Sequence, residues 1–194
     1  MRQHGTLHEM NPVRIYQIYY SEDTRNCLDA GFIPLDNVGQ RPDWREYLPI
    51  RKFLLENVLD ENTLYGFFSW RFGRKTGLDS AAVYAFIGSL TSPVDVVSFS
   101  PFFDQGAFHL NTFEQSAWNH PGMWPLWESV VPLLAPGMDP HTVVMDSRQI
   151  IFCNYFVAKA KLLANLASEM RADFSGGRTG CRSPLRPAQL ERCI

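Results

Sequence analysis

The chain has 194 residues, which fits one domain of moderate size with a single hydrophobic core. Its 18 basic and 20 acidic residues give a formal net charge of −2, so no overall positive field favours nucleic acid. The 4 cysteines are widely spaced, which argues against a disulfide framework or a zinc site and favours a reduced, cytoplasmic setting. Because the chain has neither an apolar N-terminal signal nor an apolar run of about 18 residues, we expect no transmembrane segment, and at most a peripheral association with the inner membrane.

The first part of the chain predicts a strand followed by a helix. Val13–Tyr20 is β-branched and aromatic and ends in a polar stretch, which is typical of a strand that feeds a loop. Gly31–Pro42 is rich in turn residues. Asp43 stands three residues before Glu46, as in a capping box, and apolar residues then recur at helical spacing. We therefore expect a helix over Trp44–Val58.

The next segment repeats this alternation. Leu64–Ser69 is a short aromatic run and predicts a second strand. Apolar residues at helical spacing after Ser80 predict an amphipathic helix, and Val94–Phe99 predicts a third strand. The order strand, helix, strand, helix, strand indicates an α/β protein: a single domain with a mixed, mostly parallel sheet flanked by helices. A basic cluster follows the second strand directly, namely Arg71, Arg74 and Lys75.

The second half of the chain is richer in helical patterns. We expect short helices over Thr112–Asn119 and Trp124–Leu134, and Pro132 is expected to end or kink the second of these. His141–Met145 is a further candidate strand. Apolar residues over Leu162–Met170 predict a closing helix.

The two ends of the chain differ from the rest. Residues 1–12 are expected to form a flexible N-terminus, residues 13–170 the α/β domain, and residues 171–194 a disordered tail rich in Arg, Gly and Pro. The tail has two interpretations. It is either an ordinary flexible terminus or the mark of a chain that lost its proper C-terminal part through truncation or a shifted reading frame.

The stretch Val94–Gly122 carries the densest group of reactive side chains, in a loop that follows a buried strand. Ligands of α/β proteins bind in such loops at the carboxyl edge of the sheet. Asp104 lies past the end of the strand and is a candidate to line the site. Glu114 is a candidate general base, because an apolar crevice would raise the pKa of its carboxyl group. Alternatively, Asn111 with Glu114, or Thr112 with Gln115, forms a helix capping box.

Three further groups each have a functional and a structural interpretation. Asp95 heads the third strand and could hold a divalent cation, or its place could reflect only a turn. His120 precedes Pro and Gly and could donate to a phosphate or a sugar hydroxyl, or lie in a solvated turn. Arg71 and Lys75 could clamp a phosphate, or form a solvated face. A zinc hydrolase that uses His109 is disfavoured, because Glu114 lies about 140° from it on a helix.

Four phrases of the sequence resemble, in the same order, the N-terminal domain of glycosyltransferase-like proteins from bacterial polysaccharide loci and large algal viruses. They are RIYQIYYSEDT, GFIPLDNVGQRPDWREYLPIRKFL, YGFFSWRFGRKTGL and VDVVSFSPFFDQGAFHLNTFEQSAWNHPG. The resemblance covers roughly Val13 to Lys159 and implies a GT-A-type fold, with a nucleotide-sugar held across the carboxyl ends of the N-terminal strands. With the basic cluster, it implies a nucleotide-sugar site formed by Tyr16, Gln17, Tyr19, Tyr20, Arg71, Lys75 and Asn154.

The resemblance implies a glycosyltransferase that moves a sugar from a nucleotide-sugar donor to a glycan acceptor in polysaccharide biosynthesis. Asp104, Glu114 and His120 are its catalytic candidates, and Asp95 is the candidate ligand for Mn²⁺ or Mg²⁺. The usual DxD pair is absent, which puts metal dependence in question and leaves an alternative: an inactive remnant, or a module that binds glycans or nucleotides without turnover. Convergence of these four side chains on one cleft with the Tyr20 strand end would favour the enzyme, and dispersal would favour the remnant.

Overall fold

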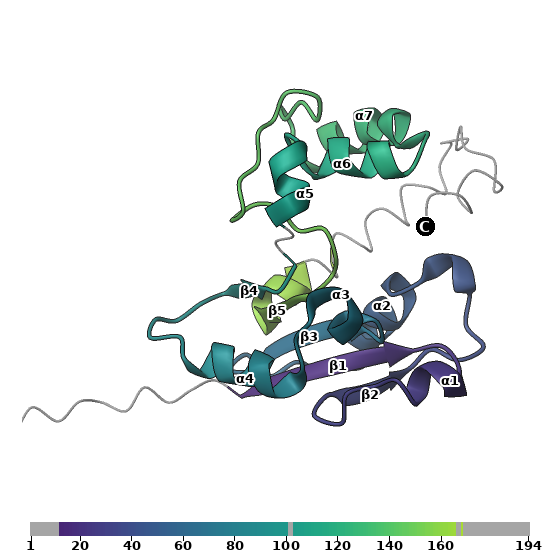
Figure 1. Cartoon of the computed structure of the whole chain (residues 1–194), viewed down its shortest axis with the longest axis vertical. Helices are drawn as coiled ribbons and strands as arrows, with labels where there is room; N and C mark the ends of the chain where they lie inside the picture. Colours follow the sequence, from purple (N-terminus) through teal and green to yellow (C-terminus); the bar gives the residue numbers. More distant parts are fainter. Residues whose placement is uncertain (1–11, 101–102, 166–167, 169–194) are drawn as a thin grey trace, which may run out of the picture.

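The computed structural model of the chain describes residues 12–100, 103–165 and 168 (Figure 1). It confirms an α/β fold with a five-stranded mixed sheet flanked by helices. The predicted flexible N-terminus, except for its last residue, and the predicted tail over residues 171–194 lie outside the described residues. None of the helices in the described part of the chain combines the length and the apolar character needed to cross a bilayer.

The sheet has the strand order β2-β1-β3-β5-β4. The strands are β1 (Val13–Tyr19), β2 (Ile33–Asp36), β3 (Leu64–Ser69), β4 (Val96–Ser98) and β5 (Phe156–Lys159). Strand β1 pairs in parallel with β2 and β3, whereas β5 is antiparallel to both β3 and β4. The carboxyl ends of β1 to β4 therefore share one edge of the sheet, and β5 begins at that same edge.

The topology reverses direction at β1. From β1 the chain passes to β2 on one side, and then crosses to β3 on the other side. In open α/β sheets, ligands bind in the crevice outside the carboxyl ends of the strands at such a reversal. The fold alone thus predicts a ligand-binding site at the carboxyl ends of β1 and β3.

Four helices accompany this part of the sheet. They are α1 (Glu22–Arg25), α2 (Tyr47–Glu56), α3 (Phe72–Thr76) and α4 (Ser80–Gly88). Helix α4 begins at an ordinary N-cap, because the side chain of Asp79 accepts a hydrogen bond from the backbone of the first turn. It starts at the residue that the apolar spacing predicts.

The predicted capping box of Asp43 and Glu46 is wrong. The Asp43 carboxylate pairs instead with the neighbouring guanidinium of Arg41, and Pro42–Trp44 form a separate 3-10 turn. Arg45 has a positive φ of 42°, a backbone conformation that an α-helix cannot contain. Helix α2 therefore begins only after this residue, with Glu46 at its N-cap and no side-chain capping bond.

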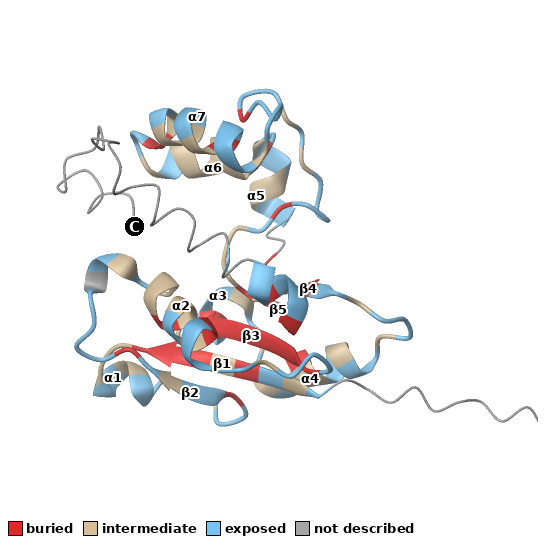
Figure 2. Cartoon of the chain, turned by 180° about the vertical axis from the view of Figure 1, so that it is seen from behind, coloured by how far each residue is buried: buried red, intermediate tan, exposed pale blue. Residues whose placement is uncertain are grey.

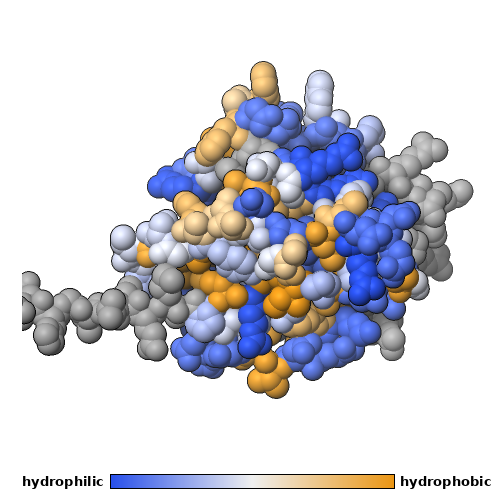
Figure 3. Space-filling view, turned by 60° about the horizontal axis from the view of Figure 1, so that its bottom comes forward, coloured by the Kyte–Doolittle hydropathy of each residue, from blue (hydrophilic) through white to orange (hydrophobic). Residues whose placement is uncertain are grey.

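Two apolar cores cover the two faces of the sheet. One contains Ile15 of β1 and Val83 of α4, and the other contains Ile18 of β1 and Leu54 of α2. Ile15 and Ile18 face opposite sides because side chains alternate along a strand. Figure 2 shows the buried residues concentrated in β1 and β3. On the face shown in Figure 3, hydrophilic residues surround smaller hydrophobic patches.

Some predicted elements differ from the observed ones. Strand β2 lies in the stretch predicted to be only turns, and β5 had not been predicted. The predicted strand His141–Met145 is wrong, because these residues form turns and irregular backbone. Pro132 does not end α7 (Met123–Leu134) but lies inside it. The closing helix begins directly after β5, at residue 160, and is described to residue 165.

Helices α5 (Phe103–Phe108), α6 (Thr112–Asn119) and α7 form a helical group that stands apart from the sheet (Figure 1). The Trp127 indole on α7 donates to the Ser116 hydroxyl on α6 over 2.7 Å. The helical group is inserted between the antiparallel neighbours β4 and β5. Its two ends are held together where the backbone N–H of Phe99 donates to the carbonyl of Tyr155 over 2.7 Å.

Candidate functional site

A crevice opens at the carboxyl edge of the sheet, beside β1 and β3. Its volume is about 380 Å³, at the lower end of the range typical of small-molecule sites. Strand β1, the loop after α1, and the segment from the end of β3 through α3 all contribute to it. Its lining residues include Gln17, Asp29, Trp70, Phe72, Arg74 and Leu78. We call this space the carboxyl-edge crevice.

A hydrogen-bond network holds one wall of the carboxyl-edge crevice in place. The Gln17 side chain is only 2% exposed; its Nε2 donates to the carbonyl of Ser69 over 3.3 Å, and its Oε1 accepts from the backbone N–H of Asp29 over 2.8 Å. The Asp29 carboxylate accepts from the backbone N–H and the hydroxyl of Ser80, over 2.8 and 2.6 Å, and from the backbone N–H of Gly31 over 2.8 Å. The Gln17 side chain therefore links β1 to β3 and to the loop after α1, and the Asp29 carboxylate links that loop to the start of α4.

The same network determines the protonation of Asp29. Burial raises the pKa of its carboxyl group, but the hydrogen bonds from Ser80 and Gly31 outweigh burial and lower that pKa below its usual value. Asp29 is consequently ionised at neutral pH. Its oxygens are already engaged in holding the loop to the start of α4, so this carboxylate has a structural role in the crevice wall.

Basic side chains gather after the end of β3, and Arg74 among them lines the crevice. The Arg71 guanidinium lies 4.8 Å from the centroid of the Trp70 ring. The ammonium group of Lys75 lies 3.8 Å from the Cys153 sulfur and 5.9 Å from the centroid of the Tyr155 ring. Together with Arg74, these cations give the carboxyl edge a local positive charge that the net charge of the chain does not reveal.

The start of β5 completes this edge. The side-chain amide of Asn154 donates to the carbonyl of Phe67 over 2.7 Å, and the Tyr155 hydroxyl is hydrogen-bonded to the Ser69 hydroxyl over 2.8 Å. Burial raises the pKa of Tyr155 to about 12, so this hydroxyl stays protonated at neutral pH. Asn154 thus lies at the predicted edge, where it positions β5 against β3.

The tyrosines of the first strand have different surroundings. Tyr16 packs in the core against Phe53 and Phe67, with ring centroids 4.5 and 5.6 Å away. Tyr19 is buried, and the Arg25 guanidinium lies 5.7 Å from its ring centroid. The Tyr20 hydroxyl is buried, and no described residue forms a hydrogen bond of ordinary geometry with it.

The carboxylate of Glu46 lies near Tyr20, and the sequence pattern had not indicated it as a site residue. Burial raises the pKa of Tyr20, and the nearby carboxylate of Glu46 raises it further. The negative charge of Glu46 also acts on Tyr155 and Cys153, which places it near the start of β5. Glu46 therefore belongs to the same edge as the basic residues, on the α2 side of the sheet.

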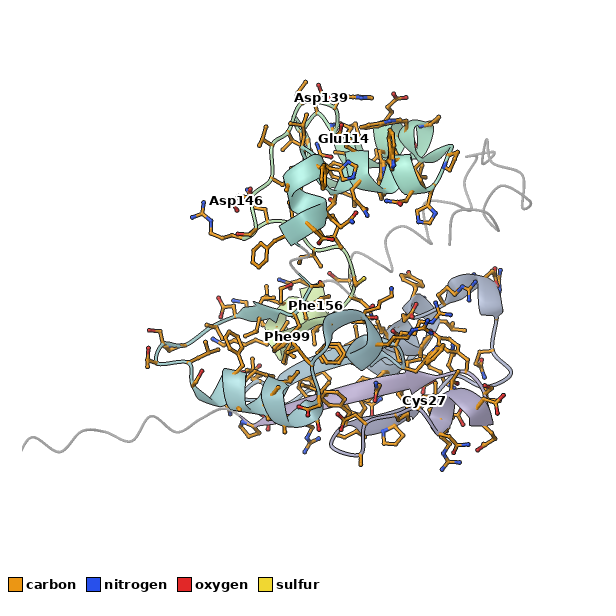
Figure 4. The ribbon with its side chains drawn as sticks, viewed as in Figure 1. Cys27, Phe99, Glu114, Asp139, Asp146 and Phe156 are labelled. Carbon is orange, nitrogen blue, oxygen red and sulfur yellow. The ribbon has the colours of Figure 1, made fainter. Side chains whose placement is uncertain are left out.

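The predicted catalytic residues lie on the helical group. Asp104 is exposed in the first turn of α5, and His120 is the C-cap of α6. Half of the predicted capping box is present: the backbone N–H of Glu114 donates to the side chain of the N-cap residue Asn111 over 2.8 Å. The Glu114 carboxylate accepts from the backbone N–H of Leu110 over 2.6 Å, rather than from that of Asn111 as a capping box requires. Figure 4 shows Glu114 on the helical group, well away from Cys27, which lines the carboxyl-edge crevice.

Asp95 lies at the opposite edge of the sheet, because it precedes β4, whose carboxyl end is at the crevice edge. Its side chain is 72% exposed and forms an ion pair of 2.8 Å with Lys159. The hydrogen bond from Lys159 lowers the pKa of Asp95. Across the described ranges, no three His, Cys, Asp or Glu side chains come together in a way that could hold a metal ion. Asp95, the predicted metal ligand, thus lies away from the crevice.

The structure thus brings together part of the predicted site. Gln17, Tyr20, Arg71, Lys75 and Asn154 share the carboxyl edge, whereas Asp95 and the three catalytic candidates do not. Sequence reasoning missed Asp29 altogether. Its signal was the Asp-Ala-Gly triplet at residues 29–31, a spacing at which an aspartate often accepts a hydrogen bond from the backbone two residues on.

Comparison of the chain with protein-family models, with curated proteins and with solved structures finds no match. A fold of this class hosts many different activities, so the function has to be argued from the carboxyl-edge crevice and its side chains.

Proposed function

We propose that the carboxyl-edge crevice binds the nucleoside diphosphate part of a nucleotide-sugar, as the donor site of a glycosyltransferase in polysaccharide biosynthesis. One observation carries the proposal: Trp70 and Arg74 line the same space of about 380 Å³ at the reversal point of the sheet. An aromatic face stacks on a nucleobase, and a guanidinium pairs with phosphate oxygens in a bidentate manner.

The neighbouring cations extend this argument to the leaving group. In glycosyl transfer, the acceptor hydroxyl forms a bond to the anomeric carbon of the sugar, and the bond from that carbon to the phosphate oxygen breaks. The electron pair leaves with the diphosphate, so positive charge near that group lowers the barrier. Arg71, Arg74 and Lys75 supply such positive charge from the chain itself. The proposed reaction assigns no role to a metal ion.

Titration calorimetry of the full-length chain tests the proposal, with UDP, GDP and their nucleotide-sugars, each with and without Mg²⁺ or Mn²⁺. We expect binding by at least one nucleotide, and a loss of about tenfold or more in affinity for Trp70→Ala and for Arg74→Ala, because a stacked base contributes about 1–3 kcal/mol. Trp118→Ala and Arg148→Ala are the matched controls, since both side chains are exposed and lie outside the crevice. A folded sample that binds none of these nucleotides would refute the proposal.

A second candidate is a binding module without turnover, and a specific observation favours it. Asp104, Glu114 and His120 lie on the helical group, and Glu114 is engaged in capping α6. The acceptor hydroxyl must lose its proton in the transfer, and these three side chains are not placed at the crevice to receive it.

The two candidates differ in turnover. The enzyme releases nucleoside diphosphate from its nucleotide-sugar in the presence of a glycan acceptor, whereas the module binds the nucleotide and releases nothing above the rate without protein. Release that is lost in Asp104→Ala or Glu114→Ala, with nucleotide affinity retained, would rule out the module. Binding without release in the wild-type chain would rule out the transferase.

A further inference from the structure

A second cavity lies next to the carboxyl-edge crevice, between α3, α4 and the end of β4. Its volume is about 430 Å³. Helix α3 contributes to both cavities, and Leu78 lines both. It is lined by Lys75, Thr76, Leu78, Ala82, Phe86, Ser98, Phe99 and Phe103. We call this cavity the apolar pocket.

The apolar pocket is strongly asymmetric in its chemistry. Phe86, Phe99 and Phe103 all line it, and the ring centroids of Phe86 and Phe99 are 6.0 Å apart. Phe86 is 51% and Phe103 is 70% exposed, so large apolar surfaces remain in contact with water unless a ligand covers them. These aromatic rings offer no hydrogen-bonding group to a hydrated ion. The shape and composition of the apolar pocket suit an apolar chain.

Lys75 supplies the single charge among the described residues that line the apolar pocket. No carboxylate of the described residues forms an ion pair with its ammonium group; its contacts are the Cys153 sulfur and the Tyr155 ring. A single cation in the lining of a largely apolar cavity complements an anionic head group on an apolar chain.

We infer that the apolar pocket binds an amphiphile, whose chain lies against Phe86 and Phe99 and whose carboxylate or phosphate pairs with Lys75. The head group would then lie beside α3, which also borders the carboxyl-edge crevice. If the proposed donor site is correct, this arrangement makes the amphiphile the acceptor. The role as acceptor rests on the proposed function, whereas the binding itself does not.

Titration of the full-length chain with dodecyl phosphate, dodecanoate and dodecanol, each below its micelle concentration, tests the inference. We expect the better of the two anions to bind at least tenfold more tightly than the alcohol, and the ratio of the two anions then identifies the head group as phosphate or carboxylate. Equal affinity for all three probes, or binding of none, would overturn the inference.

Two substitutions test the location of the ligand. Ala82→Trp fills the apolar pocket and should weaken binding of the anion at least tenfold, whereas Ala81→Trp, at an exposed neighbouring position that does not line the pocket, should not. Lys75→Gln should abolish the preference for the anions over the alcohol, and Lys52→Gln on the exposed surface of α2 should leave it unchanged. Unchanged affinity in Ala82→Trp would refute this location.

Two further measurements keep the results interpretable. Phe86→Ala removes a half-exposed ring, so it tests the same contact if Ala82→Trp does not fold, and it should weaken binding of the anion at least fivefold. A parallel titration with nucleoside diphosphate separates the two proposals. Retained nucleotide affinity without amphiphile binding refutes only the apolar pocket, and the reverse pattern refutes only the donor site.

Discussion

Replacement of Gln17 by leucine tests whether this buried side chain holds the wall of the crevice. The substitution keeps a similar volume but removes the acceptor for the backbone N–H of Asp29 and the donor to the carbonyl of Ser69. Each buried polar group left without a partner costs about 1–3 kcal/mol. Because both groups lie beside a crevice that admits water, we expect the loss in the free energy of unfolding to be about 2–4 kcal/mol.

Urea denaturation followed by far-ultraviolet circular dichroism measures this loss, with Gln40→Leu as the control. Gln40 is exposed, and its substitution should change the free energy of unfolding by no more than about 0.5 kcal/mol. The wall displaced in Gln17→Leu should also weaken nucleotide binding under native conditions. A loss below about 0.5 kcal/mol for Gln17→Leu would show that neither hydrogen bond matters to the fold.

Four further substitutions, one of them a control, have definite expectations. A Cβ on Gly66 would lie 2.9 Å from a side-chain carbon of Val157, so Gly66→Ala should cost about 1–3 kcal/mol, whereas Gly106→Ala, with its nearest contact at 3.5 Å, should be neutral or stabilising in urea denaturation. The pKa of Asp29 is lowered from the usual 3.8, so the stability that its ionised form contributes is present above that value and is lost as pH falls through the folded-state pKa. Asp29→Asn should therefore flatten the decline in the free energy of unfolding between about pH 5 and pH 2; an unchanged decline would contradict this assignment. Asp95→Asn removes an exposed ion pair and should leave stability almost unchanged, with no effect on nucleotide affinity in calorimetry; a metal-dependent loss of affinity would instead support the predicted metal role.

Much of the fold follows from local patterns. Strand β3 and helix α6 have the bounds that their composition predicts, because a full apolar run and a helical period with an Asn cap are local signals. Strand β2 was missed because Ile33–Asp36 is an edge strand with mostly exposed side chains, so it lacks the alternation that marks a half-buried strand. The predicted start of α2 failed because the positive φ of Arg45 has no signature in residue spacing.

The candidate site was less accessible to such reasoning. The cluster of cations after β3 could be predicted because it follows a strand directly. The partners of Asp29 and Asn154, however, lie 51 and 87 positions away in the sequence, and only the strand order brings them together. Glu114 illustrates the opposite case. A local capping pattern competed with a catalytic interpretation, and the local hydrogen bonds are the ones observed.

The insertion of the helical group between β4 and β5 has a consequence for the order of folding. Helices α6 and α7 are neighbours in the chain and can associate early, because their contacts close only short loops. The Ser100 hydroxyl and the carbonyl of Cys153, which join the two ends of the insertion, are 53 positions apart. Closure of that long loop costs chain entropy before the pairing of β5 with its neighbouring strands can compensate for the cost. We therefore expect β5 to dock late. Because β4 joins the sheet only through β5, the apolar pocket, which Ser98 and Phe99 help to line, would be completed in the last step of folding.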